Sequence, residues 1–204
     1  MAFYNVHTHN VHSKEIAIVQ SVKYPLERFH SSGIHPWDAD LTLIPNLEIQ
    51  LQNPFCKAMG EVGLDRLKGP SIEIQHSVLL EQISLANRLK KPVIFHIVRA
   101  WDEFYTLQKS QQETPWILHG FNQAKQFNRL LETPLFLSIG PAALINPSMH
   151  PLLSKIPAER LLFETDDFDV SISEVYQNFS RLTSTPLEDL KHQIEQNFIA
   201  IFGT

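Results

Sequence analysis

Short apolar runs bounded by turn residues recur along the chain, and the longer segments between them carry apolar residues at helical spacing. Strands that alternate with helices predict parallel pairing and an α/β fold, for which a barrel or an open sheet would fit. The expected strands are residues 2–6, 16–19, 29–34, 55–59, 93–95, 116–118, 135–139 and 161–163. The expected helices are residues 71–89, 100–109, 123–131, 170–182 and 186–202.

The clearest of these helices is the segment 71–89, where apolar residues recur three and four positions apart. Ser71 follows Pro70 and is the expected N-cap residue, because a serine side chain can accept a hydrogen bond from the first turn. No linker, low-complexity tract or repeat of fixed period interrupts the chain. We therefore expect a single domain over residues 1–204.

The 204-residue chain has the composition of a globular protein, with 43% hydrophobic residues, 19% charged residues and a formal net charge of −5. This balance excludes a disordered chain, and a count of only seven glycines excludes a collagen-like one. Cys56 is the single cysteine, which fits a reducing compartment and excludes a metal site built from several thiolates. No apolar run of membrane-spanning length and no secretory leader are visible, so we expect a cytoplasmic protein without a membrane partner.

Side chains of metal-ligand type follow five of the expected strands at their C-terminal ends. Those ends lie on one face of a parallel barrel, so residues far apart in the sequence would converge there. A single histidine at a strand end is more often a structural residue than a ligand, and the repetition carries the prediction. The residues are His7 and His9, Glu61, His96, His119 and Asp166.

The chemistry of these six side chains indicates a divalent metal. His7 and His9 are alternate residues of an extended strand, so both imidazoles can face one ion. Imidazole and carboxylate without thiolate suit Zn²⁺, Mn²⁺ or a similar ion, and six ligands exceed what one tetrahedral site uses. Two ions bridged by one carboxylate are the expected arrangement.

Six sequence blocks carry a family resemblance: FYNVHTH at residues 3–9, GIHP at 33–36, GEVGLD at 60–65, PVIFH at 92–96, LHGF at 118–121 and LLFETD at 161–166. In this order they resemble the signature blocks of TatD-family metal-dependent hydrolases, which belong to the amidohydrolase-like barrels. The resemblance spans nearly the whole chain. It implies a distorted, shortened (β/α)8 barrel of the TIM type, with one or two divalent ions (Zn²⁺, Mg²⁺ or Mn²⁺), that catalyses hydrolysis; several family members are deoxyribonucleases.

The resemblance also implies a role for each site residue. His7, His9 and Asp166 would hold the first ion, Glu61 would bridge, and His96 and His119 would hold the second. Asp166 and Glu61 would be the catalytic carboxylates, with Asp166 as general base for a metal-bound water. His35 would bind substrate by donating to one of its oxygens, and the alternative is a histidine that caps the turn before Pro36.

The chain departs from the family pattern around the expected cleft. Asn5 stands where an aspartate is usual, and Val98 stands where an arginine is usual, so that Arg99 is the next candidate to bind an anionic group. The alternative for Arg99 is a solvent-exposed residue at a helix start. The segment 9–33 is about half the usual length, which predicts that the first strand–helix unit has lost its helix.

The leading functional hypothesis is hydrolysis of a phosphodiester, with DNA as the partner. The mild acidity argues against a protein wrapped in nucleic acid but allows a transiently held anionic substrate. A small phosphomonoester, amide or lactone is the alternative substrate, since the site and not the fold sets function; a non-catalytic metal-binding barrel is the third hypothesis. A monomer is favoured. The remaining histidines are expected on the surface or in loops: His12, His30, His76, His150 and His192.

Overall fold

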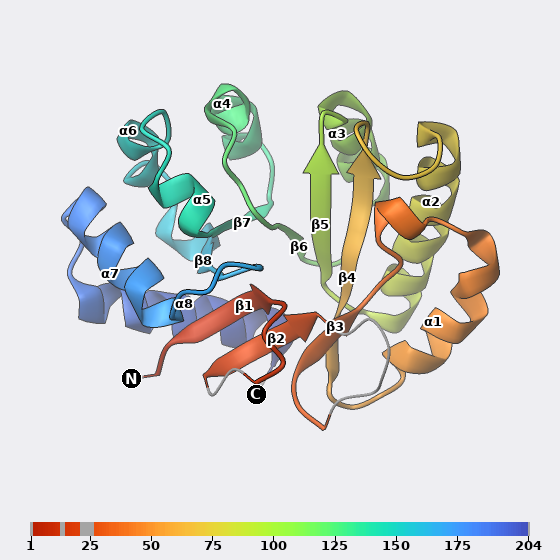
Figure 1. Ribbon diagram of the computed structural model, residues 1–204, viewed down its shortest axis with the longest axis horizontal. Coiled ribbons are helices and arrows are strands. Elements are labelled where there is room, and N and C mark those ends of the chain that lie inside the picture. Colours follow the sequence, from red (N-terminus) through yellow and green to blue (C-terminus); the bar gives the residue numbers. More distant parts are fainter. Residues whose placement is uncertain (1, 13–14, 21–26, 204) are drawn as a thin grey trace. The chain divides into compact units, whose positions relative to one another are not determined.

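The computed structural model describes residues 2–12, 15–20 and 27–203 (Figure 1). Its contacts divide the chain into two compact units. We call Met1–Val19 with Leu118–Thr204 the terminal unit, and Gln20–Ile117 the central unit.

Eight strands follow one another in the sheet in chain order, and the pairs β1–β2, β3–β4, β4–β5 and β7–β8 are parallel. The prediction of an α/β fold with eight strands is confirmed. The strands are β1 Tyr4–Thr8, β2 Ile16–Gln20, β3 His30–Ser32, β4 Cys56–Asp65, β5 Val93–Val98, β6 Trp116–Leu118, β7 Phe136–Ile139 and β8 Leu161–Phe163. The α-helices are α1 Ile44–Leu51, α2 Ile72–Leu89, α3 Trp101–Gln111, α4 Phe127–Leu131, α5 Pro141–Leu144, α6 His150–Leu153, α7 Ile172–Thr183 and α8 Leu187–Phe202.

In the terminal unit, α7 and α8 pack beside β1 and β8 (Figure 1). The ring of Phe163 on β8 lies 4.5 Å from that of Tyr176 and 4.9 Å from that of Phe179, both on α7. The Tyr176 hydroxyl accepts a hydrogen bond from the backbone N–H of Tyr4 at 3.2 Å and donates to the Tyr4 carbonyl at 3.1 Å. These contacts fix the N-terminal end of β1, at the opposite end of the strand from His7.

In the central unit, β4 and β5 approach each other too closely for a side chain at one position. Gly63 pairs with His96, and a Cβ at Gly63 would lie 1.8 Å from the His96 carbonyl oxygen. Both strands run further than the sequence pattern predicts, so Glu61 and His96 lie within strands and not after them. The expected ends were wrong because these polar residues interrupt the apolar runs while the backbone pairing continues.

Several elements differ from the sequence prediction. α1 was not predicted, because it buries only Leu47 and Leu51 and so shows little periodicity. The segment 123–131 divides into a 3₁₀ turn and the short helix α4. Ser71 does occupy the N-cap position of α2, but its side chain makes no capping hydrogen bond. Among the described residues between β1 and β2 there is no helix; residues 13–14 and 21–26 of the segment 9–33 lie outside the described residues, and the loss of the first helix stays a prediction.

None of the helices described in the structure combines the length and the hydrophobicity that a bilayer crossing requires.

His30 corrects the expectation of a surface histidine, because it lies in β3 with 1% of its surface exposed. Its Nδ1 lies 2.8 Å from the carbonyl oxygen of Arg28. Burial lowers the pKa of His30 below its usual value, and the contact with the Arg28 carbonyl opposes this only in part. The folded state therefore takes up the proton less readily than the unfolded state.

A group whose pKa is lowered in the folded state contributes stability above its unfolded pKa, and this contribution is lost as the pH falls below about 6.5. We expect the free energy of unfolding of the wild type, measured with urea, to fall between pH 7.5 and 5.5. A His30→Gln variant should show a smaller fall over the same range. His192→Gln, which replaces an exposed histidine on α8, is the control and should follow the wild type. Equal slopes for His30→Gln and the wild type would contradict the prediction.

Candidate metal centre

The terminal unit brings together His7, His9 and Asp166 from the ends of β1 and β8. His7 Nε2 and His9 Nε2 each lie 3.4 Å from Asp166 Oδ1. His7 is fully buried, whereas 42% of the His9 side chain is exposed, so the group opens to solvent on the His9 side. Ligand atoms of the three residues lie within 4.8 Å of one another.

Backbone pairing between β1 and the segment after β8 sets this geometry. The N–H of Asp166 donates to the His7 carbonyl at 3.1 Å, and the N–H of His9 donates to the Asp166 carbonyl at 3.0 Å. Asp166 adopts a left-handed conformation with φ of 53°, which aspartate and asparagine tolerate better than most residues. The turn therefore ends β8 and directs the carboxylate towards both imidazoles.

The spacing of these atoms fits a divalent ion. Bonds of about 2.0–2.2 Å to nitrogen and oxygen place neighbouring ligand atoms of a tetrahedral ion roughly 3.3–3.6 Å apart. The two separations of 3.4 Å fall within that interval. Burial acts to raise the pKa of Asp166, but the imidazoles of His7 and His9 outweigh it and hold the pKa well below its usual value. The carboxylate is thus ionised at neutral pH, as a metal ligand must be.

Asn5 links β1 to Thr165, the residue before Asp166, and it stands where the family pattern has an aspartate. Its side-chain amide donates to Thr165 Oγ1 at 2.9 Å and its carbonyl oxygen accepts from the Thr165 N–H at 3.2 Å. Thr165 Oγ1 in turn donates to Thr8 Oγ1 at 3.0 Å. Because an asparagine donates and accepts at once, it joins β1 to the residue before Asp166 without a buried charge.

His119 also lies in the terminal unit, directly after β6, and its neighbouring carboxylate is Glu164. His119 Nδ1 lies 3.6 Å from Glu164 Oε1, which accepts the Gly120 N–H at 2.6 Å. Glu164 is 1% exposed, and its ligand atoms group with those of His119 and Asp166. Sequence reasoning missed Glu164 because it was read as part of a family motif. Its place directly after β8, next to Thr165 and Asp166, was the available signal.

The central unit holds a second group, in which Glu61 faces two imidazoles. Glu61 Oε2 lies 3.5 Å from His96 Nδ1 and 3.9 Å from His35 Nε2, and Glu61 is 4% exposed. Ligand atoms of the three residues again lie within 4.8 Å of one another. One buried carboxylate with two imidazoles is a second set of donors suited to a divalent ion.

His35 shows the capping role that the sequence left open as its alternative, and its binding of substrate stays a prediction. Its Nδ1 accepts a hydrogen bond from the Trp37 N–H at 3.3 Å, which caps the 3₁₀ turn Pro36–Asp38. A neutral ring that accepts at Nδ1 carries its proton on Nε2, the atom that faces Glu61. The capping contact therefore presents Nε2–H as a donor, which suits a substrate oxygen better than a metal.

Asp65 lies against the other ring nitrogen of His96. Its Oδ2 is 3.6 Å from His96 Nε2 and accepts the indole N–H of Trp37 at 2.6 Å. Burial acts to raise the pKa of Asp65, but the hydrogen bonds from Trp37 and from the Leu67 N–H outweigh it and keep the pKa below its usual value. A carboxylate on the far side of a ligating imidazole fixes the orientation of the ring.

Two buried glutamines on α2 hold the loops of the central group. Gln82 bonds both backbone groups of Ile34, the residue before His35, at 2.7 and 3.1 Å. Gln75 accepts the Asp65 N–H at 2.7 Å and donates to the carbonyls of Asp65, Lys68 and Pro70 at 2.8–3.0 Å. Seven residues apart, the two side chains leave one face of the helix. Sequence reasoning missed them because polar helix residues are normally exposed.

We expect Gln75→Ala to lower the free energy of unfolding by about 2–4 kcal/mol, because it leaves several buried backbone groups without partners. Urea unfolding measures this. Glu81→Ala, an exposed change on the same helix, is the control and should alter stability by less than about 0.5 kcal/mol. Equal stability of the two variants would show that Gln75 does not support the loop.

Arg99 follows β5 and precedes α3 in a left-handed conformation with φ of 55°, and its side chain is exposed. This placement agrees with the alternative of an exposed residue at a helix start. Binding of an anionic group by Arg99 stays a prediction.

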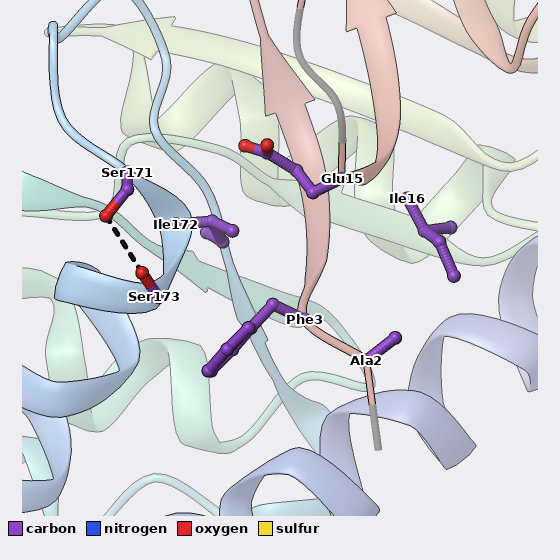
Figure 2. Close-up of a pocket in the computed structure, with 7 residues that line it drawn as sticks. All are labelled: Ala2, Phe3, Glu15, Ile16, Ser171, Ile172 and Ser173. Carbon is purple, nitrogen blue, oxygen red and sulfur yellow. Dashed lines mark hydrogen bonds between the residues drawn. The ribbon is translucent and has the colours of Figure 1, made fainter.

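A cavity of about 350 Å³ in the terminal unit is separate from these groups (Figure 2). It lies beside Phe3, which precedes β1, Ile16 at the start of β2 and Ser171 at the start of α7. Among the residues that the structure describes, Glu15 is the one charged residue that lines it, and no imidazole does. His7 lies toward the other end of β1 and Asp166 follows β8, so the cavity does not replace the candidate metal site.

Candidate ligand residues thus come together within each of the two units. His7, His9 and Asp166 form one group, with His119 and Glu164 beside Asp166, and His35, Glu61 and His96 form the other. The pair that the resemblance assigns to a second ion, His96 and His119, is divided between the two units of the chain. The ligand roles of all six predicted residues stay predictions.

Comparison with known proteins identifies the relatives of the chain. Residues 2–203 match the family model described as TatD related DNase. The 3'-5' ssDNA/RNA exonuclease TatD of Edwardsiella piscicida is 32% identical over 158 residues, which cover 70% of this chain and 59% of that protein. The deoxyribonuclease Tat-D of Schizosaccharomyces pombe is 30% identical over 177 residues, covering 77% of this chain and 56% of that protein. The chain spans less than two thirds of the length of these two curated relatives.

Two solved structures share the fold over the whole chain. The YjjV homologue of TatD from Escherichia coli K12 aligns with a TM-score of 0.83 at 21% identity, covering 99% of this chain and 98% of that one. A TatD-family hydrolase from Entamoeba histolytica aligns with the same TM-score of 0.83 at 16% identity, covering 100% of this chain and 99% of that one. The expected TIM-type (β/α)8 barrel is confirmed.

Proposed function

Because the chain belongs to the TatD-related DNase family, we propose that it is a divalent-metal-dependent hydrolase that uses an activated water to cleave phosphodiester bonds in DNA. The observation that carries the proposal is the terminal group, in which an ionised Asp166 faces His7 and His9 at 3.4 Å each. The family model covers residues 2–203, and two relatives are named for nuclease activity.

His7, His9 and Asp166 would hold one ion, and Glu61 and His96 would contribute ligands for another, with His119 beside Glu164 as a further donor. When bound, divalent ions lower the pKa of coordinated water and neutralise negative charge on a phosphate. We propose that the ion is Zn²⁺, Mg²⁺ or Mn²⁺. Bridging by Glu61 stays a prediction of the family resemblance.

The remaining steps belong to side chains of the protein. Asp166 directs Oδ1 to the two imidazoles, so we assign its second carboxylate oxygen to accept the proton of the attacking water. His35 presents Nε2–H as a donor to an oxygen of the substrate, because the cap on the Trp37 N–H occupies Nδ1. Asp65 holds the orientation of His96.

The test is a chelator-sensitive hydrolysis assay with single-stranded DNA, double-stranded DNA and a panel of phosphomonoesters, amides and lactones. We expect cleavage of DNA that stops with chelator and returns with added divalent metal. Intact DNA together with turnover of a small substrate would refute the nuclease activity and favour the small-substrate alternative. If neither DNA nor any small substrate is cleaved, and elemental analysis finds no divalent metal in the protein even after metal is added, the hydrolase proposal itself fails.

A cytoplasmic location and a monomeric state are the further parts of the proposal that rest on the sequence alone. Fractionation of the source cells and light scattering of the purified protein measure them.

A further inference from the structure

We propose that the exposed indole of Trp37 is a stacking platform for a nucleobase of single-stranded nucleic acid beside the central group of ligands. The inference rests on the proposed function and specifies how the substrate is held. The ring of Trp37 contacts that of His35, so a base that stacks on Trp37 would place the phosphate backbone of the strand near His35.

The indole is exposed and yet held in one orientation. Trp37 is 43% exposed, whereas Trp116 is completely buried. Its ring N–H donates to Asp65 Oδ2 at 2.6 Å, and its backbone N–H donates to His35 Nδ1 at 3.3 Å. A large aromatic side chain that is already fixed loses little conformational freedom when a ligand binds.

The surroundings of Trp37 distinguish it from an ordinary exposed aromatic residue, of which any surface has some. The ring centroid lies 4.5 Å from that of His35 and 5.9 Å from that of His96, both at an interplanar angle of 83°. The platform therefore adjoins two imidazoles of the candidate metal group. A base bound there lies close to the side chains that we assign to the chemistry.

The charge on this loop suits the same ligand. Lys68 is exposed and its Nζ lies 4.1 Å from the centroid of the Trp37 ring. The hydrogen bond from Gln75 to the Lys68 carbonyl, at 3.0 Å, anchors the backbone of this residue. An exposed contact between a cation and an aromatic ring is weaker than the stacking of a base, so an incoming base can displace the ammonium group. The displaced cation then lies beside the backbone phosphates, which it can neutralise.

The binding of two 12-nucleotide strands to the metal-loaded protein tests the inference. One is oligothymidylate, the other is an abasic strand with the same backbone, and both carry phosphorothioate linkages that slow hydrolysis. Fluorescence anisotropy measures the two dissociation constants. We expect the wild type to bind the strand with bases roughly tenfold more tightly, which is the size of one stacking contact.

Three variants separate stacking from other causes. Trp37→Leu should lose the preference for bases while its affinity for the abasic strand stays within about twofold of the wild type. Trp37→Phe keeps an aromatic face and should retain most of the preference. Trp101→Leu, a partly exposed tryptophan on α3, is the matched control and should behave as the wild type. Circular dichroism confirms the fold of each variant.

The inference is overturned if Trp37→Leu prefers bases as strongly as the wild type, or if the wild type shows no preference. In either case DNA cleavage by the same protein would leave the proposed function standing. A wild type that binds neither strand and cleaves no DNA would overturn both.

Discussion

Replacement of Asp166 is expected to reduce kcat/KM for DNA cleavage by at least about a thousandfold, because it removes both a ligand and the proposed proton acceptor. Asp166→Asn is the sharper variant, since asparagine tolerates the left-handed conformation at this position while it lacks the negative charge. Asp166→Ala should lose activity to the same degree, with a Tm within about 5 °C of the wild type. Kinetics and thermal unfolding measure the two effects.

The neighbouring residue provides the control for Asp166. Asp167→Asn removes one negative charge from an exposed side chain of the same segment, and it should keep at least half of the wild-type activity. Metal content by elemental analysis should fall in Asp166→Asn and stay unchanged in Asp167→Asn. Full turnover in Asp166→Asn would exclude the proposed role of this carboxylate.

His96→Ala is the second change with a large expected effect. It removes the imidazole that lies 3.5 Å from Glu61 and 3.6 Å from Asp65, so the central group would lose one of its metal ligands. We expect kcat/KM to fall by roughly a thousandfold and the metal content to fall by about one ion per chain. The terminal group of His7, His9 and Asp166 is unchanged in this variant and should still bind its ion.

His76→Ala is the control for His96, because it removes a half-buried imidazole on α2 that is in none of the ligand groups. Its activity and metal content should match the wild type. If His96→Ala kept both its metal and its turnover, the central group would not be a metal site.

The sequence was informative where a side chain of metal-ligand type directly follows a strand. His7, His9 and Asp166 follow short apolar runs, and parallel strands bring such ends together, so their proximity was predictable without coordinates. The strands that carry Glu61 and His96 continue past these residues, which the sequence pattern did not predict, since pairing of β4 with β5 does not require apolar side chains. Gly63 makes that close pairing possible, and nothing in the hydrophobic pattern reveals it.

The residues that the sequence did not reveal are buried polar ones. Gln75 and Gln82 would be read as solvent-facing by their type, and Glu164 as part of a motif, yet each satisfies backbone groups inside the protein. His30 was misread for the same reason. Whether a polar side chain has a buried backbone partner depends on residues distant in the sequence, so local patterns cannot show it.

The two glutamines of α2 have a consequence for heat inactivation. One helix anchors both the loop that carries His35 and the loop that follows Asp65, so undocking of α2 would release both loops in the same event. Loss of activity on warming would then precede the loss of secondary structure elsewhere, and would occur in a single step. The working temperature of the protein would be set by the docking of α2 and not by the melting of the whole chain.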